Sequence, residues 1–275
     1  MNATTRRQAI INYALLVFFC FIALFPIFGV FIASVYPSGS QPSSFKLPSH
    51  FAFHNFVTAW TQGDFSMYFR SSAIVAVSVV VLATGLSVLG GYAFGTMRFR
   101  GSKVLFYTFI LGLIIPTEAT IVSLYYDIRS LNLIDTWTAL ILVEVSGAVA
   151  FGVFWMRAAF LSAPRSLLEA ARIDGASTWQ IMWRIMIPFG WPAILTLMVL
   201  TFADSWNEFF LALVLTTSNQ HLTAPAGLQV FSGKYVTNTP LIAAGAVIVA
   251  LPVVMVFLLL QRQFIRGVLT GAVKG

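Results

Sequence analysis

The sequence is poor in charge, cysteine and histidine. Only 9% of its 275 residues are charged and 59% are hydrophobic, with a mean hydropathy of +0.87, so polar residues are too few to cover a water-soluble fold. Its one cysteine, Cys20, has no disulfide partner and cannot build a cysteine metal site. His50, His54 and His221 fall in predicted loops, and none forms an i,i+4 pair on a predicted helix. We therefore predict an integral membrane protein without a metal site.

Sequence motifs for catalysis are also missing. No G-x-x-x-x-G-K-[ST] loop is present to hold phosphates, so the chain is not predicted to hydrolyse ATP. The apolar runs contain no histidine and only Cys20 as a thiol, so no nucleophile and base are arranged there. We predict that the chain is not an enzyme and binds no cofactor. Its net charge of +7 would suggest nucleic acid in a soluble protein, but in a membrane protein the side on which the charges fall matters more, and we predict no nucleic-acid partner.

Apolar runs long enough to cross a bilayer, about 20 residues each, occur six times. They lie at about 10–35, 71–97, 103–124, 137–160, 188–215 and 240–262. The first follows two arginines, as a signal peptide would, but its run of about 25 residues exceeds a signal-peptide core. The sequence therefore predicts an all-α polytopic membrane protein with six transmembrane helices.

The basic residues predict the orientation of these spans. With six spans both termini lie on one side, and if that side is cytoplasmic, most lysines and arginines lie inside. The only exceptions among the 16 are Lys46, Arg70, Arg129 and Lys234. Because basic residues are enriched in cytoplasmic loops, we predict that both termini are cytoplasmic. The segment 162–187, between spans four and five, is then cytoplasmic as well.

This segment leads into the string EAARIDGASTWQIMWRIMIP, residues 169–188, which predicts a helix, a turn and a second helix. Pro164 can open the first helix because the first turn does not need its missing N–H. Gly175 can end it because glycine readily adopts the left-handed conformation. Ser177 and Gln180 fit a capping box that starts the second helix, which enters span five at the closing proline. On shape alone, an amphipathic connector on the membrane surface is an equally good interpretation.

The spacing within the string resembles the signature of ABC-importer permeases. Its parts are Glu-Ala-Ala at 169–171, Gly175, Ile185 and Pro188, with Ile187 in place of the usual leucine. Other strings are similar to the oligosaccharide permeases of the maltose- and trehalose-like group, namely FAFHNFVTAW, RFRGSK, FADSWNEFFLALVL and the C-terminal QRQFIRGVLTGAVKG. The chain is thus identified as a member of the binding-protein-dependent importer family, which implies the type I importer permease fold.

The resemblance implies that the short cytoplasmic helix is a coupling helix, which docks into a separate ATP-hydrolysing subunit. The residues implied in coupling are Glu169, Ala170, Ala171, Asp174, Gly175, Ile185 and Pro188. It also implies that Lys274 and Gly275 contact the nucleotide-binding dimer, although a frayed basic tail at the membrane surface fits them equally well. ATP and Mg²⁺ would be bound by the partner ATPase.

The resemblance further implies an assembly in the bacterial cytoplasmic membrane. Its other members would be a second homologous permease subunit, two ATP-binding subunits and an extracytoplasmic sugar-binding protein, which the outer segment 36–66 would meet. The cargo would be a di- or oligosaccharide. We expect one transmembrane domain over 1–275, with the permease core at about 71–265.

Carboxylates inside the predicted spans indicate a polar pathway. If each span is one helix rising 1.5 Å per residue, all four lie in the outer half of the membrane: Glu118, Glu144, Asp204 and Glu208. Such residues usually face a protein interior or watery cavity, and the last two would share a helix face. Together with Tyr125, Trp206 and Asn207 they predict a sugar pathway. An interfacial belt is the structural alternative, and a secondary transporter that relays protons through the acids is the alternative function.

Overall fold

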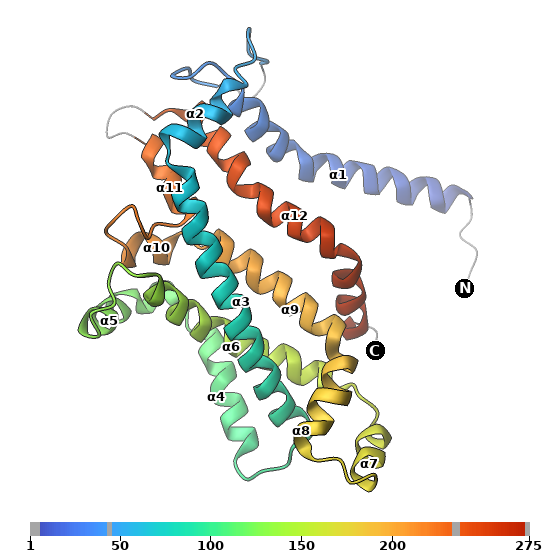
Figure 1. Ribbon diagram of the computed structural model, residues 1–275. Coiled ribbons are helices and arrows are strands. Elements are labelled where there is room, and N and C mark those ends of the chain that lie inside the picture. The colour runs from blue at the N-terminus through green and yellow to red at the C-terminus, as the bar shows by residue number, and fades with distance from the viewer. Residues whose placement is uncertain (1–5, 43–45, 233–236, 273–275) are drawn as a thin grey trace. The chain divides into compact units, whose positions relative to one another are not determined.

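The computed structural model describes residues 6–42, 46–232 and 237–272, with side chains described as far as residue 262, and its regular structure there is helical (Figure 1). The chain divides into two compact units. Unit 1 comprises Met1–Ser66 and Gly227–Leu251, and unit 2 comprises Met67–Ala226 and Pro252–Gly275. The long helix α12 (Thr239–Ala272) contributes residues to both.

Unit 1 contains two further helices and a short 3₁₀ turn: α1 (Arg6–Ser34), α2 (His54–Gln62) and η2 (Leu228–Phe231). The apolar side chains of α1 are exposed, Cys20 among them, which suits an apolar surrounding. His54 begins α2, so its expected place in a loop was wrong. The turn after α1 is held by the buried amide of Asn55, which donates to the carbonyls of Ser34 and Tyr36 at 2.8 and 2.7 Å.

Unit 2 contains all or most of each remaining helix. They are α3 (Phe65–Thr96), α4 (Ser102–Ile114), α5 (Thr117–Ser130), α6 (Trp137–Leu161), α7 (Arg165–Ile173), α8 (Thr178–Ile181), the π-helical η1 (Met182–Met186), α9 (Ile187–Asn207), α10 (Phe210–Leu215) and α11 (Ala224–Gly227). Five helical segments of the described residues are long and apolar enough to cross a membrane, and one bent pair would make a sixth. The six expected apolar spans are therefore present by length and composition, but two of them differ in form from the prediction.

The third span was predicted as one helix over 103–124, and this is wrong. α4 and α5 are bent by 99° at a short break, and Ile115 at the break is extended (φ −83°, ψ 112°). The reason is Pro116, whose ring disfavours a helical conformation for the residue before it. The predicted depth of Glu118 was counted along a continuous helix from Lys103, so it is wrong for the same reason.

The fifth span was predicted over 188–215, and both ends are wrong. Its helical run begins at Thr178 and continues past Pro188 to Asn207, because the π-helical η1 joins α8 to α9. At the other end Glu208 is extended (ψ 118°), and α10 starts two residues later. Consequently Asp204 and Glu208 do not follow each other on one continuous helix.

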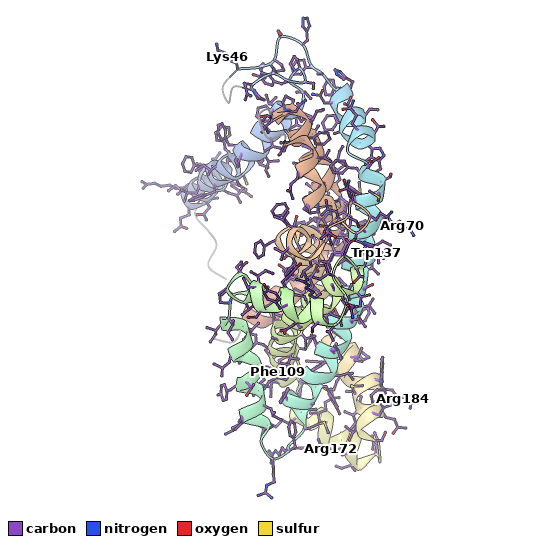
Figure 2. All side chains as sticks on the ribbon, turned by 90° about the vertical axis from the view of Figure 1, so that its left-hand side faces the viewer. Lys46, Arg70, Phe109, Trp137, Arg172 and Arg184 are labelled. Atoms are coloured by element: carbon purple, nitrogen blue, oxygen red, sulfur yellow. The ribbon has the colours of Figure 1, made fainter. Side chains whose placement is uncertain are left out.

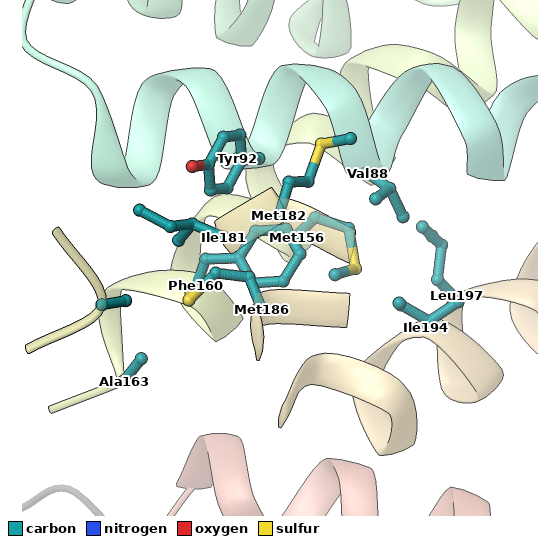
Figure 3. Close-up of a cluster of buried hydrophobic side chains, with 11 residues drawn as sticks. Val88, Tyr92, Met156, Phe160, Ala163, Ile181, Met182, Met186, Ile194 and Leu197 are labelled. Atoms are coloured by element: carbon teal, nitrogen blue, oxygen red, sulfur yellow. The ribbon is translucent and has the colours of Figure 1, made fainter. Parts of the chain in front are cut away.

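The centre of unit 2 is a close contact between α3 and α6. A Cβ atom added at Gly91 would lie 2.4 Å from the Cβ of Met156, so glycine is required for the two backbones to approach this closely. A cluster of buried side chains extends from this contact to α7, α8 and α9 (Figure 3). Its members are Val88, Tyr92, Met156, Phe160, Ala163, Ala171, Ile181, Met182, Met186, Ile194 and Leu197.

Candidate functional site

A cavity of about 470 Å³ lies in unit 2, where the break between α4 and α5 meets α6 and α9. Its polar side chains are carboxylates and hydroxyls: Glu144, Asp204 and Glu208, with Thr117, Thr201 and Ser205. Among the described residues that line it, none is basic. Apolar surface comes from residues such as Phe151 and Leu200, so the cavity offers acceptors beside apolar walls.

Glu144 reaches the cavity from the middle of α6. One of its carboxylate oxygens accepts a hydrogen bond from the hydroxyl of Ser205 on α9. The other oxygen, Oε1, is buried and has no partner among the described residues. A buried acceptor without a partner is costly, so this atom is suited to receive a donor from water or from a passing ligand.

The two acids of span five differ in their surroundings. Glu208 follows the end of α9, and its Oε1 accepts from the N–H of Leu211 at 2.8 Å, which caps the first turn of α10. Asp204 is exposed on the last turns of α9. Both line the cavity, Asp204 from the last turns of α9 and Glu208 from the extended link between α9 and α10.

The other residues predicted for the pathway are not among the cavity's lining. Glu118 is exposed in the first turn of α5. Tyr125, also on α5, is half-buried and packs against a cluster of buried hydrophobic side chains. Trp206 is buried in contact with the rings of two phenylalanines on α3 and α9. Asn207 is exposed and donates to the carbonyl of Ala203 at 2.7 Å. Of the predicted set, only three of the four acids meet in one place: Glu144, Asp204 and Glu208.

The capped segment has the predicted helix, turn and helix. α7 ends at Ile173, and Gly175 adopts the left-handed conformation at φ +76°. Ser177 and Gln180 form the capping box, with the Ser177 N–H donating to Oε1 of Gln180 at 2.8 Å. Pro164 lies one residue before the helix, as its N-cap, instead of inside the first turn.

Most of the residues predicted for coupling are exposed. Within α7 the one buried side chain is Ala171, which belongs to the cluster of Figure 3. Glu169 and Asp174 are exposed, as is Ile173, whose exposed fraction is 85%. The remaining members of the set are divided: Ala170, Gly175 and Pro188 are exposed and Ile185 is half-buried. α7 therefore presents a free face of mixed charge and apolar surface.

The end of unit 2 that carries α7 also carries basic side chains. Arg172 and Arg184 lie there, whereas Arg70 and Trp137 lie toward the other end, with Phe109 between them (Figure 2). The charge-based prediction of membrane sides requires this separation of Arg172 and Arg184 from Arg70. The tail residues Lys274 and Gly275 lie outside the described residues.

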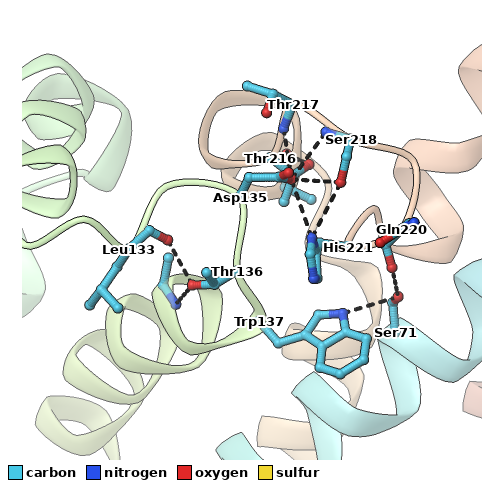
Figure 4. Close-up of polar contacts among 12 residues, drawn as sticks. Ser71, Leu133, Asp135, Thr136, Trp137, Thr216, Thr217, Ser218, Gln220 and His221 are labelled. Carbon is cyan, nitrogen blue, oxygen red and sulfur yellow. Dashed lines mark hydrogen bonds and ion pairs between the residues drawn. The ribbon is translucent and has the colours of Figure 1, made fainter.

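A polar cluster that the sequence analysis missed lies between the α5–α6 loop and the loop after α10 (Figure 4). Oδ1 of Asp135 accepts from the N–H groups of Thr217 and Ser218 at 3.1 and 3.0 Å, and Nδ1 of His221 lies 3.4 Å away. Desolvation alone would raise the pKa of Asp135, but these hydrogen bonds outweigh it and lower the pKa to about 2. The one signal in the sequence was an aspartate just before a helix cap at Thr136, which does not reveal a partner 82 residues away.

Trp137 extends this cluster to α3. Its ring packs edge-on against His221, with centroids 5.2 Å apart, and its Nε1 donates to Oγ of Ser71 at 3.1 Å. Ser71 in turn donates to the carbonyl of Gln220 at 3.0 Å, and Arg70 lies over the indole ring. Trp137 thus has a full set of structural contacts here, away from the cavity lining.

Comparisons with known proteins identify the family. The model of the family described as "Binding-protein-dependent transport system inner membrane component" matches residues 87–270. The chain is 30% identical to the diacetylchitobiose uptake system permease protein NgcG of Streptomyces coelicolor, over 99% of this chain and 91% of the relative. It is 34% identical to the arabinooligosaccharides transport system permease protein AraQ of Halalkalibacterium halodurans, over 94% of each chain.

Solved structures agree with these relatives. A chain of a bacterial ABC transporter that imports the acidic polysaccharide alginate has a TM-score of 0.79 and 26% identity, covering 96% of this chain and 100% of that one. Neither an enzyme nor a proton-coupled secondary transporter finds support among these matches. Since the family model covers more than half of the sequence, the chain belongs to the inner membrane components of binding-protein-dependent transport systems, the permease subunits of ABC importers.

Proposed function

We propose that this subunit conducts a di- or oligosaccharide through the cavity of unit 2 and is driven by an ATPase that docks on α7. The relatives are named for diacetylchitobiose, arabinooligosaccharide and trehalose transport, which supports a sugar as cargo. The complete assembly would contain a second permease subunit, two ATP-binding subunits and an extracytoplasmic binding protein. The termini and α7 would lie in the cytoplasm, in keeping with the basic residues near α7.

The chemistry of the cavity supports a sugar. Carboxylates accept hydrogen bonds from hydroxyl groups, and the hydroxyls of Thr201 and Ser205 can donate and accept. Phe151 and the aliphatic lining provide surface for the apolar faces of a pyranose ring. The volume of about 470 Å³ falls within the range of about 300–1,000 Å³ that is usual for small-molecule sites. An aqueous polar path also explains why acids are tolerated inside membrane-spanning helices.

One observation carries the proposal of coupling: α7 and the cavity are joined by one helical run. α7 leaves its face free and buries only Ala171 in the cluster at the start of that run. The run then continues from Thr178 to Asn207, whose last turns carry Thr201, Asp204 and Ser205 into the cavity. A partner that moves α7 therefore acts on one end of a rod whose other end lines the sugar path.

The test is reconstitution of the assembled transporter in proteoliposomes with its binding protein. Uptake of radiolabelled diacetylchitobiose, arabinotriose and trehalose is measured together with ATP hydrolysis. We expect uptake of at least one sugar that needs ATP and survives collapse of the proton gradient. Uptake by the isolated chain without ATP, or uptake of none of the three, would contradict the proposal.

Two variants test the docking role of α7 in this assay. Gly175→Pro cannot adopt φ +76° and removes the N–H that donates to the carbonyl of Arg172, so the turn must distort. Glu169→Lys reverses an exposed charge on the free face. We expect insertion to be preserved and sugar uptake per ATP to fall about tenfold or more, because contact with the partner is lost.

The matched control is Asp127→Lys, a charge reversal at an exposed site on α5 where a lysine suits the helix end. It should transport as the wild type does. Wild-type coupling in both α7 variants would remove the assigned role of this helix.

A further inference from the structure

Hydrogen bonds fasten the run Thr178–Asn207 to the rest of unit 2 at three levels. At its start, the hydroxyl of Tyr92 on α3 donates to the carbonyl of Thr178 at 3.0 Å. In its middle, Nε1 of Trp155 on α6 donates to the carbonyl of Ala193 at 3.0 Å. Near its end, Ser205 donates to Glu144 beside the cavity. The first and last of these levels are about 40 Å apart at 1.5 Å per residue.

The donor of the first hydrogen bond, Tyr92, has a tightly packed side chain. Tyr92 is 6% exposed, and its ring packs edge-on against Phe160 of α6, with centroids 6.3 Å apart and planes at 87° (Figure 3). The residue before it, Gly91, lies in a close contact of α3 with α6. The ring is therefore fixed by α3 and α6, and the hydroxyl is the part that reaches the start of α8.

The acceptor of this hydrogen bond lies just beyond the turn that follows α7. Thr178 is the first residue of α8, three positions after the left-handed Gly175. The turn is held to α7 by the N–H of Ala176, which donates to the carbonyl of Ala171 at 3.0 Å. A glycine turn is the most deformable part of this path, because glycine adopts many backbone conformations at little cost.

We infer that Tyr92 is a positioning residue for coupling, whose hydroxyl holds the start of α8 against α3. Because the start of α8 is held in this way, a displacement of α7 rotates or shifts the whole run Thr178–Asn207 and reaches the cavity. Without the hydroxyl, the start of α8 moves with the glycine turn and the displacement is absorbed there. The inference rests on the proposed docking role of α7.

Tyr92→Phe isolates the hydroxyl, since it keeps the ring and its packing against Phe160. A neutral hydrogen bond of this kind biases an equilibrium by about two- to tenfold. We therefore expect sugar uptake per ATP hydrolysed to fall by about two- to tenfold while the amount of assembled transporter stays the same. Tyr107→Phe is the matched control, because Tyr107 is 63% exposed on α4.

Distances between spin labels test the inference without any sugar. Cys20 is the only cysteine in the sequence, so Cys20→Ala provides a cysteine-free background. One label pair, at the exposed Ile173 and Val104, reports the movement of α7. A second pair, at Ile114 and Leu213, flanks the cavity lining. Both distances are measured in the assembled transporter without nucleotide and with ATP and vanadate.

In the wild type and in Tyr107→Phe, we expect both distances to change with nucleotide. In Tyr92→Phe the α7 pair should still change, whereas the change at the cavity pair should fall by half or more. If the distance of the cavity pair changes in Tyr92→Phe as much as in the wild type, the inference is overturned. It is also overturned if both distances stop changing and the transporter no longer assembles, because a merely structural role of Tyr92 predicts that result. If the α7 pair stays still in the wild type, the docking proposal itself fails.

Discussion

The third and the fifth span both contain proline, yet one span is broken and the other continues. At Pro116 the chain turns by 99° between α4 and α5 (Figure 1). At Pro188 the helical run passes on without a break, preceded by the π-helical η1 over Met182–Met186. Both prolines remove an N–H from the backbone and crowd the carbonyl four residues earlier. Whether the helix breaks or continues at a proline therefore depends on how the neighbouring residues accommodate the ring.

The backbone beside the two prolines is arranged differently. Before Pro188, the N–H of Ile187 donates to the carbonyl of Met182, five residues back, and this wider turn makes room for the proline ring. After Pro116, Thr117 starts a new helix and Glu118 lies in its first turn, where a carboxylate is favourable. The broken span and the continuous one meet at the cavity, so the first supplies its wall and the second its link to α7.

Pro116→Leu should have the largest effect, because it makes the broken span resemble the continuous one. Leucine restores the N–H and favours the helix by about 3 kcal/mol over proline. Spin labels at Val104 and Tyr126 would then lie about 33 Å apart along one helix, against about 21 Å for two arms meeting at the bend. We expect sugar uptake to be lost almost completely, since the cavity wall moves away.

The control for this variant is Pro26→Leu, the same exchange inside the continuous helix α1. It should leave uptake unchanged. A label distance near that of the wild type in Pro116→Leu would show that the break has another cause.

Pro188→Ala tests the continuous span and should have a smaller effect. The new N–H can bond to the carbonyl of Arg184, so the wider turn of η1 is no longer needed, and α8 would rotate by about 100° relative to α9. The contact between Tyr92 and Thr178 should then be lost, and uptake per ATP should fall several-fold with ATP hydrolysis preserved. Pro192→Ala, one turn further along α9, is the control and should transport normally. Equal coupling ratios in the two variants would mean that η1 has no part in transmission.

The two spans also show which structural features could be predicted from the sequence and which could not. Apolar runs predict the number of spans, and local chemistry predicts the turn at Gly175 and the capping box, because each depends on neighbouring residues. The break at Pro116 was within reach of the same reasoning, since Ile115 precedes a proline. The hydrogen bond between Glu144 and Ser205 was not, because it joins α6 to α9 across 61 residues of sequence.

Asp135 joins the far ends of the two spans and should give the smallest effect. Its N–H donates to the carbonyl of Leu215 at the end of α10, and its carboxylate accepts from the loop that follows. The hydrogen bonds lower the pKa of Asp135 from 3.8 to about 2 in the folded protein, so its carboxylate contributes stability above pH 4. That contribution is lost as the pH falls from about 4 to about 2.

Asp135→Asn should therefore lower the free energy of unfolding by about 1 kcal/mol at neutral pH, because an amide oxygen is a weaker acceptor than a carboxylate. Thermal unfolding in detergent, measured between pH 7 and pH 2, gives the comparison. The difference between the wild type and Asp135→Asn should shrink as the pH falls through the window between 4 and 2. Asp127→Asn, at the exposed end of α5, should show no such difference, and a gap that is constant with pH would mean that the charge of Asp135 does not hold the two span ends together.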